Sequence, residues 1–115
     1  MKGRGFAFRL GCALQGLRLA FREESSFRTQ CLAALLALGS LPFLHPPLVW
    51  AALVVLLVAL VLALELVNTA LEHTLDGLHP GQARFVQGAK DCAAAAVLLL
   101  SGAAVVVYGL MLCAL

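Results

Sequence analysis

The sequence contains very little charge for its length. Asp, Glu, Lys and Arg together make up 12% of its 115 residues, whereas about a quarter of the residues are charged in an ordinary soluble domain. Hydrophobic residues make up 63% of the chain, and the mean hydropathy is +1.00. This composition excludes a water-soluble globular protein and indicates an integral membrane protein.

Several motifs are also missing. The chain has no GxxxxGK[ST] loop, no GxGxxG fingerprint and no HExxH helix, so it lacks the signatures of soluble nucleotide-binding folds and of zinc proteases. Its cysteines, at positions 12, 31, 92 and 113, form no CxxC pair and no cluster with histidine. A disulfide framework and a zinc site are therefore unsupported. Any nucleotide would have to be held by helix ends and individual side chains.

Long apolar stretches predict three membrane-spanning helices, at about residues 29–45, 49–76 and 90–115. About 20 apolar residues are needed to cross the ~30 Å hydrocarbon core, which the second and third stretches supply. The first apolar run is shorter, so we expect preceding polar residues to extend its helix through the headgroups. Pro46 and Pro47 predict a tight turn between the first two spans.

The segment before the first span predicts an amphipathic surface helix over about residues 5–28. Leu10, Leu14, Leu17 and Phe21 follow i, i+4, i+7, i+11 spacing and share one helical face. We therefore expect an all-α integral membrane protein, a single domain over residues 1–115 with this surface helix and three spans.

The basic residues predict the orientation in the membrane. Two of the eight, Arg84 and Lys90, lie between the second and third spans, and the other six precede the first span: Lys2, Arg4, Arg9, Arg18, Arg22 and Arg28. Loops rich in Lys and Arg stay in the cytoplasm. We therefore expect a cytoplasmic N-terminus and a C-terminus outside.

A polar stripe marks the end of the second span. Glu65, Asn68, Glu72 and Asp76 follow i, i+3, i+7, i+11 spacing, which places them within an arc of about 80° on one helix face. A carboxylate beside hydrocarbon is costly unless it is paired, metal-bound or protonated, so such residues usually mark a functional site. The alternative is that Glu65 and Asn68 only form hydrogen bonds that pack helices together, and that Glu72 and Asp76 are merely solvated.

Neighbouring charges fit phosphate chemistry. An acidic stripe suits Mg²⁺, which binds carboxylates and substrate phosphates. Lys90 and Asp91 begin the third span at the same depth, where a lysine can bind phosphate or simply anchor the topology. Glu24, in the pair Glu23-Glu24, is either a further metal ligand or part of a solvated acidic pair.

Three blocks of sequence carry a resemblance to a known family: GLRLAFREESSFR at 16–28, ELVNTALE at 65–72 and AKDCAAAAV at 89–97. Together they resemble the prokaryotic diacylglycerol kinase family, which includes the undecaprenol kinases of Gram-positive bacteria. The resemblance covers nearly the whole chain. It implies a homotrimer in the bacterial inner membrane, with active sites shared between neighbouring subunits.

The resemblance also implies roles for individual residues. Glu65 corresponds to the general base that takes the proton from the lipid hydroxyl, and Glu24 and Glu72 correspond to the Mg²⁺ ligands that orient ATP. The other implied groups are nucleotide contacts at Glu24, Glu72, Lys90 and Asp91, supporting residues Asn68 and Asp76, and lipid contacts at Arg9, Arg18, Phe21 and Glu65.

The expected function is ATP-dependent phosphorylation of a membrane lipid alcohol. Diacylglycerol, giving phosphatidic acid, is the first expectation, and undecaprenol is the alternative acceptor. Two alternatives of another class are a small ion or proton pathway, because acidic stripes also suit relays, and a structural subunit. We expect no nucleic-acid partner.

Overall fold

The computed structural model describes residues 3, 5–81 and 83–115. Lys2 and Arg4, which were counted among the basic residues of the N-terminal segment, lie outside this part. Every element of the described part is helical, as predicted: α1 (Phe6–Glu23), α2 (Ser25–Leu44), α3 (Leu48–Leu78) and α4 (Arg84–Ala114).

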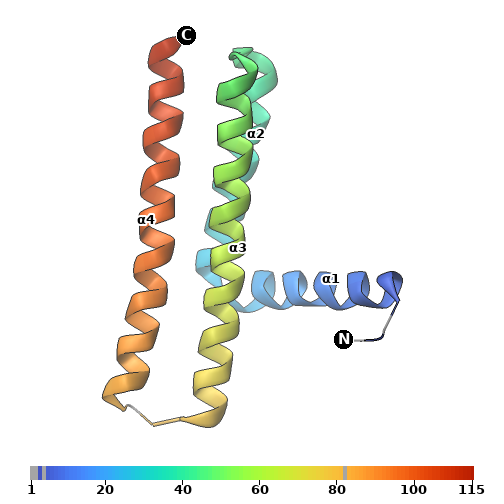
Figure 1. Cartoon of the computed structure of the whole chain (residues 1–115), viewed down its shortest axis with the longest axis vertical. Coiled ribbons are helices and arrows are strands. Elements are labelled where there is room, and N and C mark those ends of the chain that lie inside the picture. Colours follow the sequence, from blue (N-terminus) through green and yellow to red (C-terminus); the bar gives the residue numbers. More distant parts are fainter. Residues whose placement is uncertain (1–2, 4, 82) are drawn as a thin grey trace.

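The helices α2, α3 and α4 run along one common direction, while α1 extends crosswise from the bundle (Figure 1). The antiparallel helices α3 and α4 lie side by side, and α2 packs against α3. The α3–α4 connection lies at one end of the bundle, and the α2–α3 turn and the C-terminus lie at the other. The C-terminal part of α3 therefore extends beyond the level of α1 toward the α3–α4 connection (Figure 1).

Three of these helices are long and apolar enough to cross a membrane within the described part: α2 with 20 residues, and α3 and α4 with 31 residues each. Their outward surfaces expose large apolar side chains, such as Leu35, Leu98 and Leu99. Water would not tolerate such a continuous apolar surface on a folded monomer, whereas hydrocarbon does. The chain is therefore a membrane protein.

The observed bounds correct two of the predicted ones. The helix predicted over about residues 5–28 ends at Glu23, because Glu24 adopts an extended backbone (φ −115°, ψ 109°) that ends α1 and begins α2. The third span was expected from residue 90, but α4 begins at Arg84. The helical hydrogen bonds already begin at this point, since the backbone N–H of Gln87 donates to the carbonyl of Ala83 at 3.1 Å.

The break at Glu24 is stabilised by hydrogen bonds to the end of α1. The Arg28 guanidinium, at Nη1, donates to the carbonyl oxygens of Phe21 at 2.8 Å and Arg22 at 3.1 Å. The last carbonyls of a helix have no partner within it, and a cation near them is favourable. Arg28 in α2 therefore fixes the direction in which α1 leaves the bundle.

Two hydrogen bonds join α2 to α4 within the apolar bundle. Gln30 Nε2 donates to Ser101 Oγ at 2.9 Å, and the hydroxyls of Ser40 and Tyr108 lie 2.6 Å apart. The side chains around a cavity of about 420 Å³ between α2, α3 and α4 include three of these polar residues, Gln30, Ser101 and Tyr108. Such bonds hold membrane helices together because hydrocarbon offers the groups no other polar partner.

Candidate active site

The polar stripe on α3 begins with a buried carboxylate. Glu65 is 2% exposed, and its Oε1 accepts a hydrogen bond of 2.8 Å from the hydroxyl of Ser26 at the start of α2. Thr69, one turn further along α3, donates its hydroxyl to the backbone carbonyl of Glu65 at 3.0 Å. The ion pairs found among residues 5–81 and 83–115 do not include Glu65. A neutral hydroxyl, rather than a cation, is thus its polar partner.

The next residues of the stripe offer an oxygen that has no partner. Asn68 Nδ2 donates to Glu72 Oε1 at 3.2 Å, which leaves the other carboxamide atom, Oδ1, buried and without a hydrogen bond. Buried polar atoms are normally paired, and an orphaned one calls for an explanation. Beside Glu72, this oxygen is suited to a ligand that donates a proton or carries positive charge.

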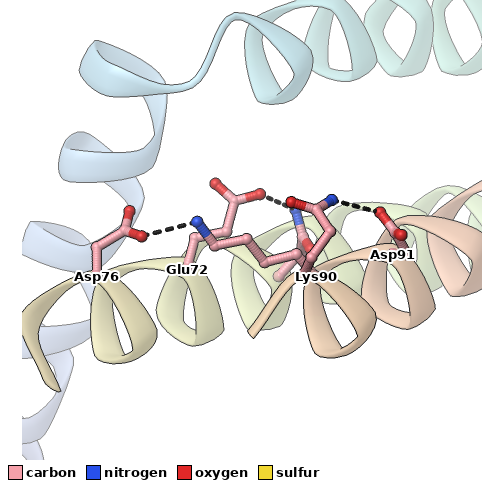
Figure 2. Close-up of polar contacts among 6 residues, drawn as sticks. Glu72, Asp76, Lys90 and Asp91 are labelled. Atoms are coloured by element: carbon pink, nitrogen blue, oxygen red, sulfur yellow. Dashed lines mark hydrogen bonds and ion pairs between the residues drawn. The ribbon is translucent and has the colours of Figure 1, made fainter. Parts of the chain in front are cut away.

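The polar ends of α3 and α4 meet at the far end of the stripe. Lys90 Nζ lies 2.7 Å from Asp76 Oδ1, and Gln87 Nε2 donates to Asp91 Oδ1 at 2.8 Å. Figure 2 shows Glu72, Asp76, Lys90 and Asp91 on the same side of the α3–α4 pair. The Asp76 side chain is 64% exposed, so this end of the site is open to water.

Glu24 joins the site from the α1–α2 junction. Burial raises the pKa of its carboxyl above the usual range, and the negative charges of Glu72 and Glu65 raise it further, against the opposing effect of His73. His73 Nε2 also lies 3.5 Å from Glu23 Oε1. The junction is therefore docked against α3 at the level of the stripe, and it brings a third carboxylate toward Glu65 and Glu72.

The raised pKa of Glu24 predicts a stability effect. An acid whose pKa is higher in the folded protein stabilises the fold below its unfolded pKa of about 4.3, and this contribution is lost as pH rises through the folded pKa. Without divalent cations, Glu24→Gln should therefore unfold a few degrees higher than the unmodified protein at pH 7.5. At pH 4 the difference should vanish. Thermal unfolding followed by circular dichroism in detergent with EDTA measures this, and a lower midpoint at both pH values contradicts it.

The carboxylates can be compared with the needs of a metal ion. Within the part of the chain that the structure describes, no cluster of three or more His, Cys, Asp or Glu residues is arranged to hold a metal by itself. Zinc and calcium sites need such clusters. Mg²⁺ usually takes only one or two protein carboxylates and fills its other positions with water and substrate phosphate. Glu24 and Glu72, with the free oxygen of Asn68 nearby, fit that requirement.

A groove separates α1 from the bundle. It has a volume of about 470 Å³, and its walls include Arg18 and Phe21 from α1 and Leu62 from α3. Leu62 lies three residues before Glu65 on α3, so this wall of the groove is about one helical turn from the buried carboxylate. Arg9, in contrast, is exposed further along α1. Two of the three residues expected to contact lipid from α1 thus share one groove.

Sequence patterns pointed to the stripe, but not to the bond between Ser26 and Glu65 or to the contact between His73 and Glu23. Both contacts join residues far apart in the chain, and hydroxyls and histidines carry no spacing signal by themselves. The one available hint was that Ser26 lies two residues from Glu24, within a block that resembles the family.

Comparison with known proteins decides the family. The model of the family described as prokaryotic diacylglycerol kinase matches residues 11–112. The chain belongs to this family. The kinase is 39% identical over 102 residues to the diacylglycerol kinase of Synechocystis sp. It is 33% identical over 97 residues to that of Haemophilus influenzae, and 31% identical over 102 residues to that of Escherichia coli K12.

The matches cover most of the kinase but not all of each relative. They include 87%, 84% and 89% of this chain, and 58%, 82% and 84% of the Synechocystis, Haemophilus and Escherichia proteins. The chain thus spans less than two thirds of the Synechocystis relative. The family and all three relatives are named diacylglycerol kinase, which supports a lipid kinase with ATP as co-substrate and does not favour the undecaprenol alternative. A lipid kinase is also favoured over an ion pathway or a structural subunit.

Proposed function

We propose that this kinase transfers the γ-phosphoryl group of ATP to diacylglycerol, giving phosphatidic acid. The observation that carries the proposal is the buried carboxylate of Glu65 on α3, hydrogen-bonded to Ser26 and 2% exposed. It lies seven residues, or about 10 Å of helix, from Glu72. With that separation, the proposed base would lie near the lipid and the proposed metal ligand nearer water.

Glu65 acts as the general base in this proposal. It accepts the proton of the lipid hydroxyl while the hydroxyl oxygen attacks the γ-phosphorus, and the bond to the β-phosphate oxygen breaks to release ADP. Little covalent work falls to the protein in phosphoryl transfer, so positioning and charge stabilisation supply most of the catalysis. Because the proposed base lies within the bundle, competing water would be kept away from the reacting hydroxyl.

Glu24 and Glu72 would hold Mg²⁺, with Asn68 in support. When bound, the ion would neutralise charge on the ATP phosphates and orient them. Burial, and after it the negative charge of Glu72, raises the pKa of the Glu24 carboxyl, and a divalent cation between the two carboxylates would relieve their repulsion. The unpaired Oδ1 of Asn68 supports this role as well.

Lys90 and Asp91 would contact the nucleotide, and Asp76 would support them. Lys90 lies 2.7 Å from Asp76, so the lysine is held on the open side of the site that it shares with Glu72 and Asp91 (Figure 2). A lysine ammonium is a compact charge suited to phosphate oxygens. On the lipid side, Arg18 and Phe21 in the groove, together with Arg9 on α1, would contact the headgroup region and acyl chains.

The assembly and orientation follow the same proposal. α1 would lie as an amphipathic helix on the cytoplasmic surface of the bacterial inner membrane, and the α3–α4 connection would lie in the cytoplasm, where ATP is available. The C-terminus, at the other end of the bundle (Figure 1), would then be outside. A homotrimer with shared sites would cover the open side of the stripe with a neighbouring subunit.

The acceptor can be tested directly. The purified protein in mixed micelles should convert diacylglycerol to phosphatidic acid with radiolabelled ATP and Mg²⁺, at a rate at least about tenfold above that with undecaprenol. Thin-layer chromatography of the lipid products measures both rates side by side. A preference for undecaprenol would overturn the acceptor, and inactivity on both alcohols would overturn the kinase site itself.

A further inference from the structure

Ser26 lies in the first turn of α2, where a serine hydroxyl usually serves its own helix. Such hydroxyls commonly accept hydrogen bonds from nearby backbone N–H groups or donate them to nearby backbone carbonyls. Ser26 instead donates to Glu65 Oε1 at 2.8 Å, across 39 residues of sequence. Its proton is therefore directed at the carboxylate of another helix.

The surroundings of Glu65 make this contact important. Glu65 is 2% exposed, so water has little access to its carboxylate. The nearby hydroxyl of Thr69 donates to the backbone carbonyl of Glu65, not to its side chain. The charge of Glu65 is also coupled to that of Glu24, which repels it. Among the described residues, Ser26 is thus the side chain found hydrogen-bonded to this carboxylate.

A carboxylate has two oxygens, and the hydrogen bond from Ser26 distinguishes them. Oε1 accepts the serine proton, which restrains the orientation of the carboxylate, and Oε2 is the oxygen whose electron pairs are not shared with Ser26. Reacting groups must be held close to their productive geometry, since a displacement of about 1 Å can cost 100-fold in rate. A free Glu side chain has three rotatable bonds, and without a partner it would sample several orientations.

We infer that Ser26 is a positioning residue of this kinase, which orients the carboxylate of Glu65 for proton transfer from the lipid hydroxyl. This inference rests on the proposed role of Glu65 as the general base. Ser26 lies two residues after Glu24, at the break between α1 and α2. The same short segment therefore supplies a metal ligand and orients the base, so the two halves of the site are aligned by one turn of backbone.

The first test compares three serine variants in the mixed-micelle assay with diacylglycerol. Ser26→Ala should lower kcat by about 10- to 100-fold, the range for a hydrogen bond to a charged group, while KM for diacylglycerol and for MgATP changes less than about twofold. Ser26→Thr, which keeps the hydroxyl, should restore kcat to within a few-fold of the unmodified enzyme. Ser25→Ala changes the neighbouring serine, which is exposed like Ser26 but is not the serine hydrogen-bonded to Glu65, and it should have no effect. Full activity of Ser26→Ala, or failure of Ser26→Thr to restore activity, would overturn the inference.

A double-mutant cycle separates positioning from a general structural role. Glu65→Asp shortens the side chain by one methylene, so its carboxylate is withdrawn from Ser26 while a weak base remains. If Ser26 acts through Glu65, Ser26→Ala should lower kcat of the Glu65→Asp enzyme by less than about twofold. The same 10- to 100-fold loss in both backgrounds would overturn the inference.

The two levels of the proposal fail differently. If Glu65→Gln is inactive and Ser26→Ala is fully active, the inference about Ser26 is wrong but the proposed role of Glu65 stands. If Glu65→Gln is fully active, the proposed role of Glu65 as the general base is wrong, and so is the inference about Ser26.

Discussion

Glu65→Gln should lower kcat by about 10²- to 10⁴-fold, the contribution typical of a general base. Glutamine has nearly the same shape, and its carbonyl oxygen can still accept the hydrogen bond from Ser26. The substitution removes the basic carboxylate without opening a cavity in the bundle. The measurement is the rate of phosphatidic acid formation in mixed micelles at saturating ATP and diacylglycerol.

The matched control for Glu65→Gln is Glu23→Gln. Glu23 is also acidic, but its side chain is 46% exposed and it lies at the end of α1, next to His73. We expect this variant to keep kcat within about twofold of the unmodified enzyme. Retention of more than a third of the activity by Glu65→Gln would contradict the assignment of the base, provided that both variants show the same helical content.

Glu72→Gln should raise the Mg²⁺ concentration for half-maximal rate by about 100-fold and should lower the maximal rate as well. A carboxylate ligand supplies a formal charge that an amide can't replace, and the loss of even a supporting interaction around a metal typically costs about 10- to 100-fold in affinity. Initial rates measured against Mg²⁺ at constant free ATP report the change.

Glu24→Gln should shift the Mg²⁺ dependence in the same direction as Glu72→Gln, since the two carboxylates are expected to share the ion. Glu23→Gln, at the adjacent position, should leave that dependence unchanged. If all three variants show the same Mg²⁺ requirement as the unmodified enzyme, the metal site lies elsewhere.

The helices of this fold could be predicted because hydrocarbon leaves few choices. A backbone that crosses it must satisfy its own hydrogen bonds, so a long apolar run predicts a helix directly. The second span was expected over residues 49–76 and is found at Leu48–Leu78. The stripe from Glu65 to Asp76 could be recognised as well, because helical periodicity alone places these residues on one face.

The helix ends and the contacts between helices were harder to predict. The segment around Glu24 has no proline or glycine to signal a break, and the hydrogen bonds of Arg28 with the end of α1 that stabilise the break have no signature in the sequence. The bond between Ser26 and Glu65 depends on how α2 and α3 pack. No local pattern in the sequence encodes that packing, although both residues lie in blocks that resemble the family.

The length of α3 has a consequence for the lipid environment of the enzyme. A helix of 31 residues is about 46 Å long, whereas the hydrocarbon core is about 30 Å thick. The apolar first half of α3 sets how deeply the helix sits, so a thicker bilayer would immerse Glu65 and a thinner one would lift it toward the headgroups, unless the helix tilts. Acyl-chain length would then tune turnover independently of which lipid alcohol is phosphorylated.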